Sequence, residues 1–262
     1  MKRTMLITGA SAGLGAALAR QYASLGWNLV LTARREDRLE ALATELKSIY
    51  DTDSKVIAAD LFSETAVPDL MMALGGQQID GVINNAGYGH PRTYLSSDWE
   101  DHKKFNHLMT VVPIELTRAL LPPMVERGFG RIMQVASLAG HMPGSKGHTL
   151  YAAVKAYLIK FSESLNAEMK GTGVHVSALC PGFVLTEFHD VNGTREGINK
   201  LPNFMVMNAD VCAKLAAQAL EKNQDVFISG RVNRFLARLN RWMPWLGKYV
   251  MGRSSTSYRN QN

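Results

Sequence analysis

The sequence predicts an α/β fold in which a doubly wound parallel sheet of about seven strands is covered by helices on both faces. Short apolar runs rich in Val, Ile and Leu alternate with segments of helical periodicity, and right-handed crossovers then make successive strands parallel. The expected strands are 4–8, 28–32, 54–59, 80–84, 131–136, 174–180 and 225–229. The expected helices are 14–25, 36–49, 64–74, 98–127, 150–170 and 210–221.

The length and composition favour one large domain. The chain has 262 residues, of which 46% are hydrophobic and 20% are charged, as in an ordinary globular protein. We expect a single domain over residues 1–230 and a basic amphipathic extension over 231–262. The stretch 183–208 is less regular, and we interpret it as a lid rather than a plain surface loop, because long loops in compact domains are often functional.

Cysteine usage and hydropathy indicate the compartment. Two cysteines, Cys180 and Cys212, cannot build a disulfide framework, which favours a reducing compartment. No run of about 18 apolar residues predicts a membrane-spanning helix. The N-terminal apolar stretch is too short for a signal peptide. We therefore expect a cytoplasmic protein.

A glycine-rich turn follows the first expected strand and opens a helix. It reads TGASAGLG over residues 8–15. Glycine lets the backbone turn tightly and approach a ligand, and the free N–H groups at a helix start favour a pyrophosphate. Because it lies between a strand and a helix, the turn predicts a dinucleotide site. Its cofactor-binding residues would be Gly9, Ser11, Gly13, Leu14 and Gly15.

The same turn allows two other interpretations. Residues 9–13 fit the Gly-x-Ser-x-Gly elbow of serine hydrolases, in which Ser11 would be the nucleophile. That reaction needs an acid and then a histidine downstream, but His189 is the last histidine, which leaves pairs such as Asp60 with His141. A purely structural turn is the other alternative, and we favour the dinucleotide site over both.

The end of the second strand predicts which dinucleotide binds. An NAD site carries Asp or Glu about 20 residues past the glycines, where it bonds the ribose 2′-hydroxyl. Here Ala33 stands at that place and Arg34 follows it. A guanidinium binds a 2′-phosphate that an acid would repel, so we expect NADP(H). The alternative is that Arg34, Arg35 and Arg38 form a solvated helix start, although cations are unfavourable there.

Three side chains have the chemistry of carbonyl reduction. Tyr151 and Lys155 are four residues apart, on one face of an expected helix, and Ser137 follows the fifth strand. Tyrosine has a pKa of about 10, which is too high for efficient acid–base work. An ammonium about 4 Å away contributes about 4 kcal/mol at an effective dielectric of about 20. We therefore expect Lys155 to lower the pKa of Tyr151 toward neutrality.

With these motifs in order, the chain resembles the classical short-chain dehydrogenases/reductases over most of its length, from Met5 to Gly230. The resemblance implies a Rossmann-type domain, a nicotinamide cofactor and commonly a homodimer or homotetramer. The motifs that carry it are the TGASAGLG turn, Asp60, Asn84-Asn85-Ala86-Gly87, Ser137, Tyr151, Lys155, and Pro181-Gly182 followed by Thr186.

The resemblance also implies residue roles. Tyr151 would donate or accept the proton, Lys155 would bind the ribose and modify the pKa of the tyrosine, and Ser137 would hydrogen-bond the carbonyl. Asp60 would face the adenine. The remaining cofactor contacts would be Asn85, Ala86 and Gly87 along the cleft, and Pro181, Gly182 and Thr186 at its carboxamide end.

One position departs from the family pattern. Members usually carry a further asparagine on the long helix after the fourth strand, where it helps to hold a proton-relay water. Counting back from Pro122 puts Met109 in that slot, and Asn106 lies one turn earlier. We favour Met109 in the slot, and its thioether is too weak an acceptor to replace the amide.

We therefore expect an NADP(H)-dependent oxidoreductase that transfers a hydride between nicotinamide and a carbonyl or alcohol carbon, with no metal. A non-catalytic NADP(H)-binding sensor or scaffold protein is the alternative, and turnover separates the two. The segments expected around the substrate are largely apolar, which favours a hydrophobic carbonyl over a sugar. They contain Tyr88, His90, His141, Met142, Phe183, Leu185, Phe188, His189, Phe204, Met205 and Met207.

The C-terminal extension carries the basic charge. After Asp225 the chain holds seven cations and no acid, so the first 225 residues carry a net charge of −1 and a nucleic-acid-binding core is disfavoured. Apolar residues recur at helical spacing from Val232 to Met243, with arginines on other faces. We favour a helix packed on its own core or on a partner subunit over one that lies on an anionic membrane surface.

Overall fold

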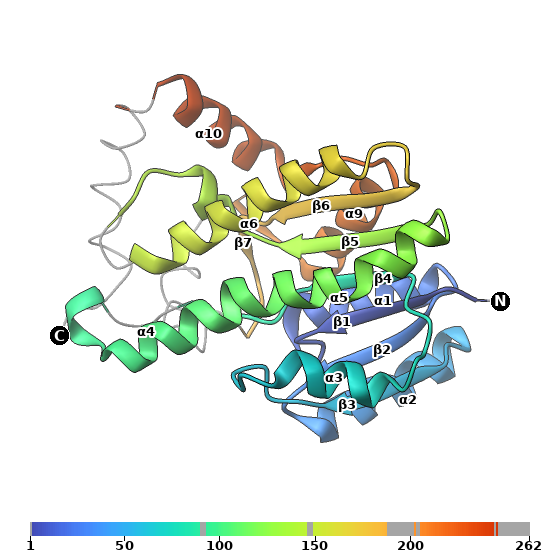
Figure 1. Cartoon of the computed structure of the whole chain (residues 1–262). Coiled ribbons are helices and arrows are strands. Elements are labelled where there is room, and N and C mark those ends of the chain that lie inside the picture. Colours follow the sequence, from blue (N-terminus) through green and yellow to red (C-terminus); the bar gives the residue numbers. More distant parts are fainter. Residues whose placement is uncertain are drawn as a thin grey trace.

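The computed structural model describes residues 2–89, 93–145, 149–187, 202, 205–243 and 245. Its centre is a seven-stranded parallel sheet with the order β3-β2-β1-β4-β5-β6-β9 (Figure 1). The strands are β1 (Thr4–Thr8), β2 (Asn28–Ala33), β3 (Ser54–Ala58), β4 (Gly81–Asn84), β5 (Gly130–Val135), β6 (Val174–Cys180) and β9 (Val226–Ile228). The doubly wound Rossmann-type fold is confirmed.

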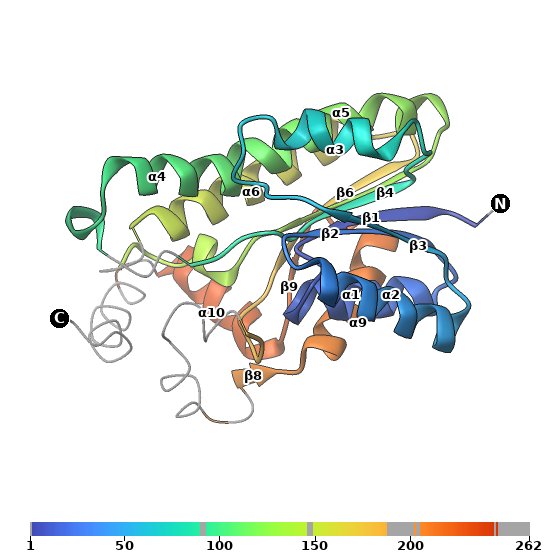
Figure 2. The ribbon, with the colours of Figure 1, turned by 90° about the horizontal axis from the view of Figure 1, so that it is seen from below.

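Helices cover both faces of the sheet, as Figure 2 shows. One layer consists of α1 (Gly13–Ser24), α2 (Glu36–Tyr50) and α9 (Ala209–Glu221). The other consists of α3 (Ala66–Leu74), α4 (Trp99–Asn106), α5 (Val112–Glu126) and α6 (Thr149–Glu168). Alternate residues of β1 enter different cores, Met5 and Ile7 toward α1 and Leu6 toward α5. Burial on both faces explains why the strands are continuously apolar.

The strand order reverses between β1 and β4. The chain first builds β1, β2 and β3 toward one edge and then returns to place β4 on the other side of β1. At such a reversal the connections after the two strands diverge, which leaves a crevice at their carboxyl ends. The glycine-rich turn after β1 and the segment after β4 therefore face the same crevice.

The helix expected over 98–127 is interrupted, so the prediction of one continuous helix is wrong. A π-helical turn, His107–Val111, separates α4 from α5. Pro113 lacks the N–H that would bond the carbonyl of Met109 in a regular α-helix, which accounts for the wider turn.

The helical stretch Trp99–Glu126 is long and apolar enough to cross a membrane by length and composition, although it contains no unbroken run of about 18 apolar residues. Its apolar face is accounted for within the fold, because Leu116, Leu120 and Met124 are buried in the core beneath it. One such helix is weak evidence for a membrane span.

Four short elements and the start of the tail complete the described fold. β7 (Phe183–Val184) pairs in parallel with β8 (Val206–Met207), and η1 (Tyr94–Ser96) and η3 (Leu138–His141) are 3-10 turns. Most of the segment interpreted as a lid, 188–201 with 203–204, lies outside the described residues. The helix α10 (Arg231–Trp242) packs on its own chain, because Ala237 is buried and Asn240 Nδ2 donates to the carbonyl of His141 at 2.7 Å.

Candidate active site

The glycine-rich turn between β1 and α1 has the conformation that a phosphate site needs. Gly9 and Gly13 have φ angles of 66° and 56°, which favour glycine. A Cβ on Gly15 would lie 2.3 Å from the carbonyl oxygen of Gly9. In the described chain α1 begins without a side-chain cap and without an acid in its first turn. Its first N–H groups can therefore bind an anion, and the turn fits the pyrophosphate of a dinucleotide.

A hydrogen-bond network ties this turn to the end of β4. Asn85 Nδ2 donates to the carbonyls of Thr8 and Gly9 at 2.9 and 3.2 Å. Thr8 Oγ1 accepts the backbone N–H groups of Asn85 and Ala86, each at 2.9 Å. The side chain of Asn85 therefore fixes the shape of the turn from behind.

Arginines gather beyond β2, at the end of the cleft expected to hold the ribose phosphate. Arg34 lies near the Phe62 ring, with Cζ 5.7 Å from its centroid. Arg35 donates from Nε and Nη2 to Ser11 Oγ at 3.3 and 3.2 Å, and Arg38 lies one turn further along α2. Ser11 is thus held by a guanidinium instead of a histidine, which argues against the hydrolase interpretation.

Ser137, Tyr151 and Lys155 meet at the opposite end of the cleft. Ser137 lies between β5 and η3, where its Oγ accepts the N–H of Ala139 at 3.1 Å, and its side chain hydrogen-bonds with Tyr151. Tyr151 and Lys155 project from the first turns of α6. Lys155 Nζ lies 5.7 Å from the centroid of the Tyr151 ring and donates to the carbonyl of Val135 at 2.6 Å.

Burial dominates the ionisation of this group. It raises the pKa of Tyr151 to about 12, and the hydrogen bond with Ser137 opposes the rise only in part. Burial also lowers the pKa of the Lys155 amine to about 8. The expectation that Lys155 brings the pKa of Tyr151 toward neutrality is therefore wrong for the protein without cofactor, because the dry environment disfavours both charged forms.

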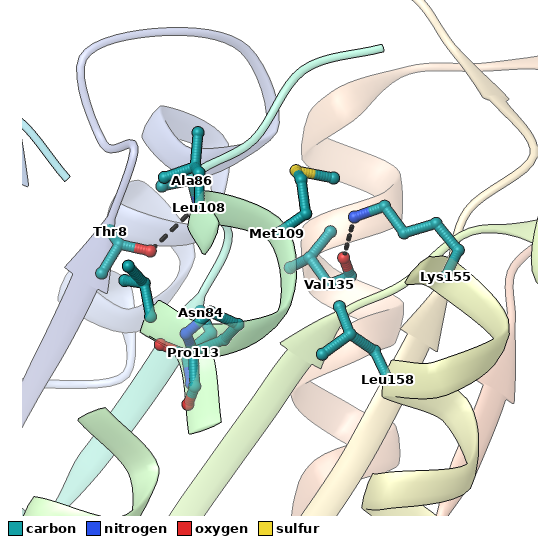
Figure 3. A pocket seen from close by; sticks show the side chains of 10 residues that line it. Thr8, Asn84, Ala86, Leu108, Met109, Pro113, Val135, Lys155 and Leu158 are labelled. Atoms are coloured by element: carbon teal, nitrogen blue, oxygen red, sulfur yellow. Dashed lines mark hydrogen bonds between the residues drawn. The ribbon is translucent and has the colours of Figure 1, made fainter. Parts of the chain in front are cut away.

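Met109 lies beside Lys155 at a small cavity of about 10 Å³, which is about the size of one water (Figure 3). Val135 and Leu158 line the same cavity, whereas Asn106 does not. Met109 is 2% exposed. A Cβ on Gly87 would lie 2.7 Å from its sulfur. The structure thus places Met109, and not Asn106, next to Lys155, and its place in the asparagine slot of the family pattern stays a prediction.

The predicted site residues all line one cleft of about 620 Å³ at the carboxyl ends of the strands. They are Gly9, Ser11, Gly13, Leu14, Gly15, Arg34, Asp60, Asn85, Ala86, Gly87, Ser137, Tyr151, Lys155, Pro181, Gly182 and Thr186. The structure adds Arg35, Phe62 and Glu187 to the wall. Of these, only Arg35 had a signal in the sequence, as a second cation after β2.

The expected substrate segments are placed only in part. Tyr88 lines the cleft and packs edge-to-face against Phe62 and Phe105, with ring centroids 5.8 and 5.3 Å away. The expected residues that lie outside the described chain are His90, Phe188, His189 and Phe204. Those that are described but do not line this cleft are His141, Met142, Phe183, Leu185, Met205 and Met207.

Known proteins are similar to this chain in sequence. A family model described as short chain dehydrogenase matches residues 3–197. The chain is 37% identical over 192 residues to sulfoacetaldehyde reductase from Chromohalobacter salexigens, which covers 72% of this chain and 75% of that one. It is 29% identical over 253 residues to very-long-chain 3-oxoacyl-CoA reductase-B from Danio rerio, which covers 94% and 78%.

A solved structure is similar over nearly all of the chain. The short-chain dehydrogenase from Sphingobium yanoikuyae in complex with NADPH matches with a TM-score of 0.81 at 30% identity, over 99% of this chain and 96% of that one. The family match, the parallel sheet and the cleft that fits a dinucleotide point to one assignment. The chain belongs to the short-chain dehydrogenase family, and it is an NADP(H)-dependent oxidoreductase that acts on CH–OH or C=O groups.

Proposed function

We propose that Ser137, Tyr151 and Lys155 perform the proton transfer of carbonyl reduction in this enzyme. The bound NADPH supplies the hydride. The observation that supports this most is that the three side chains line the same cleft as the uncapped start of α1. Ser137 hydrogen-bonds the substrate oxygen, Tyr151 gives it a proton, and Lys155 binds the ribose and offsets the negative charge left on the phenolate.

The ionisation of the pair in the protein without cofactor matches the starting state of reduction. Reduction begins with a protonated Tyr151, and a pKa of about 12 keeps the phenol protonated at physiological pH. Oxidation would instead begin with the phenolate, which burial disfavours. With a pKa of about 8, the amine of Lys155 is mostly charged at neutral pH and is available to stabilise that phenolate once the proton has left.

We propose a hydrophobic carbonyl as the substrate. Tyr88 lines the cleft and packs edge-to-face against the buried ring of Phe105, and Leu108 and Val184 add apolar side chains to the same cleft. The names of the two relatives do not select one substrate, because they range from sulfoacetaldehyde to a very-long-chain 3-oxoacyl-CoA. The wall of this chain's own cleft is therefore the basis of the proposal.

Initial rates of NADPH and NADH oxidation against ketones, aldehydes, quinones and acyl-chain carbonyls test both proposals. Tyr151→Phe is expected to lose at least about 100-fold in kcat while it still binds NADPH. Tyr157→Phe is the matched control, because Tyr157 is exposed on the same helix, and its rates should equal those of the wild type. Full turnover by Tyr151→Phe would contradict the assignment, and NADPH binding without turnover of any compound would favour the sensor.

We further propose a cytoplasmic enzyme, dimeric or tetrameric, whose tail contacts anionic membrane surfaces. The outer face of α10 exposes Phe235 and Trp242, at 63% and 81%. No acid follows Asp225, so this face would repel a second copy of itself, whereas an anionic bilayer complements both its charge and its aromatic groups. The exposed arginines on α10 are Arg231, Arg238 and Arg241.

Cosedimentation of the full chain with lipid vesicles tests the proposed membrane contact of the tail. Light scattering measures the number of subunits in the oligomer. We expect binding to vesicles that contain phosphatidylglycerol but not to pure phosphatidylcholine. Replacing Phe235 and Trp242 together by alanine should abolish it, whereas Trp99→Ala, which changes an exposed tryptophan on α4, should not. Vesicle binding that survives the double replacement would contradict the proposed membrane contact of this face. A changed oligomeric state of the double variant would assign the face to a subunit interface instead.

A further inference from the structure

Glu187 brings a carboxylate into the ribose end of the cofactor cleft. Its oxygens accept from Arg38 Nη1 at 2.8 and 3.0 Å and from Arg35 Nη1 at 3.2 Å. Arg35 also donates to Ser11 Oγ, so this ion-pair cluster is tied to the glycine-rich turn. The two cations come from the wall after β2, and the acid comes from the opposite wall, after β7.

The backbone before Glu187 lies against the turn that would hold the pyrophosphate. A Cβ on Gly13 would lie 3.1 Å from Cβ of Thr186, so the two segments are in contact. The hydrogen bond from Arg38, together with Arg35, holds the pKa of the Glu187 carboxyl below its usual value. Glu187 is therefore an anion at neutral pH, held in front of two guanidinium groups.

A 2′-phosphate and this carboxylate require the same donors. The phosphate carries a charge of about −1.5 to −2 against −1 for the acid, and it matches the planar fork of an arginine. The two anions would repel each other if both stood at Arg35 and Arg38. We propose that Glu187 is an intramolecular competitor of the 2′-phosphate, which NADP(H) must displace and NAD(H) need not. The acid thereby lowers the preference for NADP(H), and the proposal rests on Arg35 as a ligand of that phosphate.

The exposure of the cluster sets the size of the effect. The side chains of Arg35, Arg38 and Glu187 are 43%, 44% and 49% exposed. Exposed ion pairs are weak. The population in which Glu187 is bound to the two arginines therefore exceeds the population in which it is released from them by only a few-fold. The apparent Kd of NADPH rises as the fraction of protein with free arginines falls. Removal of the carboxylate should therefore lower the Kd of NADPH by about three- to tenfold. It should lower the Kd of NADH by less than about twofold.

Titration of the full-length protein with NADPH and NADH tests this on wild type, Glu187→Gln and Asp37→Asn. Asp37 is an exposed acid in the first turn of α2, between the two arginines, so Asp37→Asn removes the same charge nearby without touching the ion pairs. The nucleotides 2′,5′-ADP and 5′-ADP repeat the comparison without a nicotinamide. Glu187→Gln should bind NADPH and 2′,5′-ADP more tightly than the wild type does, but it should bind 5′-ADP equally well. Added salt should reduce the difference in affinity between the two proteins.

Several outcomes overturn the proposal. Unchanged or weaker NADPH binding by Glu187→Gln would mean that the acid does not compete or that it orients the arginines. An equal gain for NADH, or in Asp37→Asn, would assign the effect to the general field of the surface. Arg35→Ala tests the premise separately: unchanged NADPH binding would remove the phosphate site and the proposal with it. If Arg35→Ala weakens NADPH binding but Glu187→Gln does not strengthen it, Arg35 is a ligand of the phosphate and only the competition by Glu187 is refuted.

Discussion

Replacing Lys155 by methionine is expected to make the cofactor-free protein more stable at neutral pH while it removes the ammonium of the site. The lysine is 6% exposed, and its amine donates to the carbonyl of Val135. Methionine follows the unbranched path of the lysine stem and adapts to irregular packing. The substitution therefore keeps the apolar contacts of Lys155 and takes away its charge.

The magnitude follows from the pKa of the buried amine. Burial lowers it from the ordinary 10.5 to about 8, and one pKa unit corresponds to about 1.4 kcal/mol. Folding with a charged Lys155 therefore costs about 3 kcal/mol at neutral pH. The carbonyl of Val135 loses its donor in the variant, which costs about 1 to 2 kcal/mol. The expected net gain in the free energy of unfolding is about 1 to 2 kcal/mol.

The gain is confined to a defined range of pH. Between about pH 8 and pH 10.5 the unfolded chain binds a proton at Lys155 that the folded protein has released. The free energy of unfolding of the wild type therefore rises with pH across this window, and the methionine variant lacks this contribution. The advantage of Lys155→Met is largest below pH 8, shrinks above it and reverses toward pH 10.5.

Urea denaturation of both proteins from about pH 6 to about pH 10 measures the effect. Lys160→Met is the matched control, because Lys160 lies on the same helix with its side chain 76% exposed, and its replacement should change the stability by less than about 0.5 kcal/mol at every pH. A Lys155→Met protein that is less stable than wild type at pH 7, or a difference that does not vary with pH, would refute the reasoning.

Substitutions at three further positions test individual contacts. Thr8→Val should lower the free energy of unfolding by about 2 kcal/mol, because two backbone N–H groups after β4 lose their acceptor; denaturation with urea measures it. Gly15→Ala should abolish NADPH binding by calorimetry, since its Cβ would lie 2.3 Å from the carbonyl oxygen of Gly9. Met109→Asn should destabilise by about 2 to 3 kcal/mol and Met109→Leu by less than about 1.5 kcal/mol, and equal melting temperatures would contradict the burial of that side chain.

The position of the site could be predicted because it depends on strand order alone. The carboxyl ends of parallel strands meet at one edge of the sheet, so motifs that follow strands converge there whatever their separation in sequence. Gly9 follows β1, Asn85 follows β4, Ser137 follows β5 and Pro181 follows β6, and all four line the cleft. Recognition of the strands was therefore enough to assemble these residues.

The properties that depend on the surroundings of a side chain could not be predicted in this way. The spacing of Tyr151 and Lys155 brings them near each other, but their pKa values depend on how dry the site is, which many packed residues determine together. Glu187 meets its arginines across 149 and 152 residues of sequence, and no local pattern marks it. The strands β7 and β8 have two residues each, too few to show any periodicity.

The two ends of the cleft hold their cations in physically different ways. Lys155 is buried and donates to a backbone carbonyl, and burial lowers its pKa and makes its charge costly to the stability of the fold. Arg35 and Arg38 are half-exposed, so Glu187 and solvent can balance their charge at little cost. The charge at Lys155 thus lowers the stability of the free protein, whereas the charges of the two arginines are balanced by Glu187 and solvent. A charge that serves cofactor binding and the stability of the free fold are therefore opposed at Lys155, and at the arginines they are not.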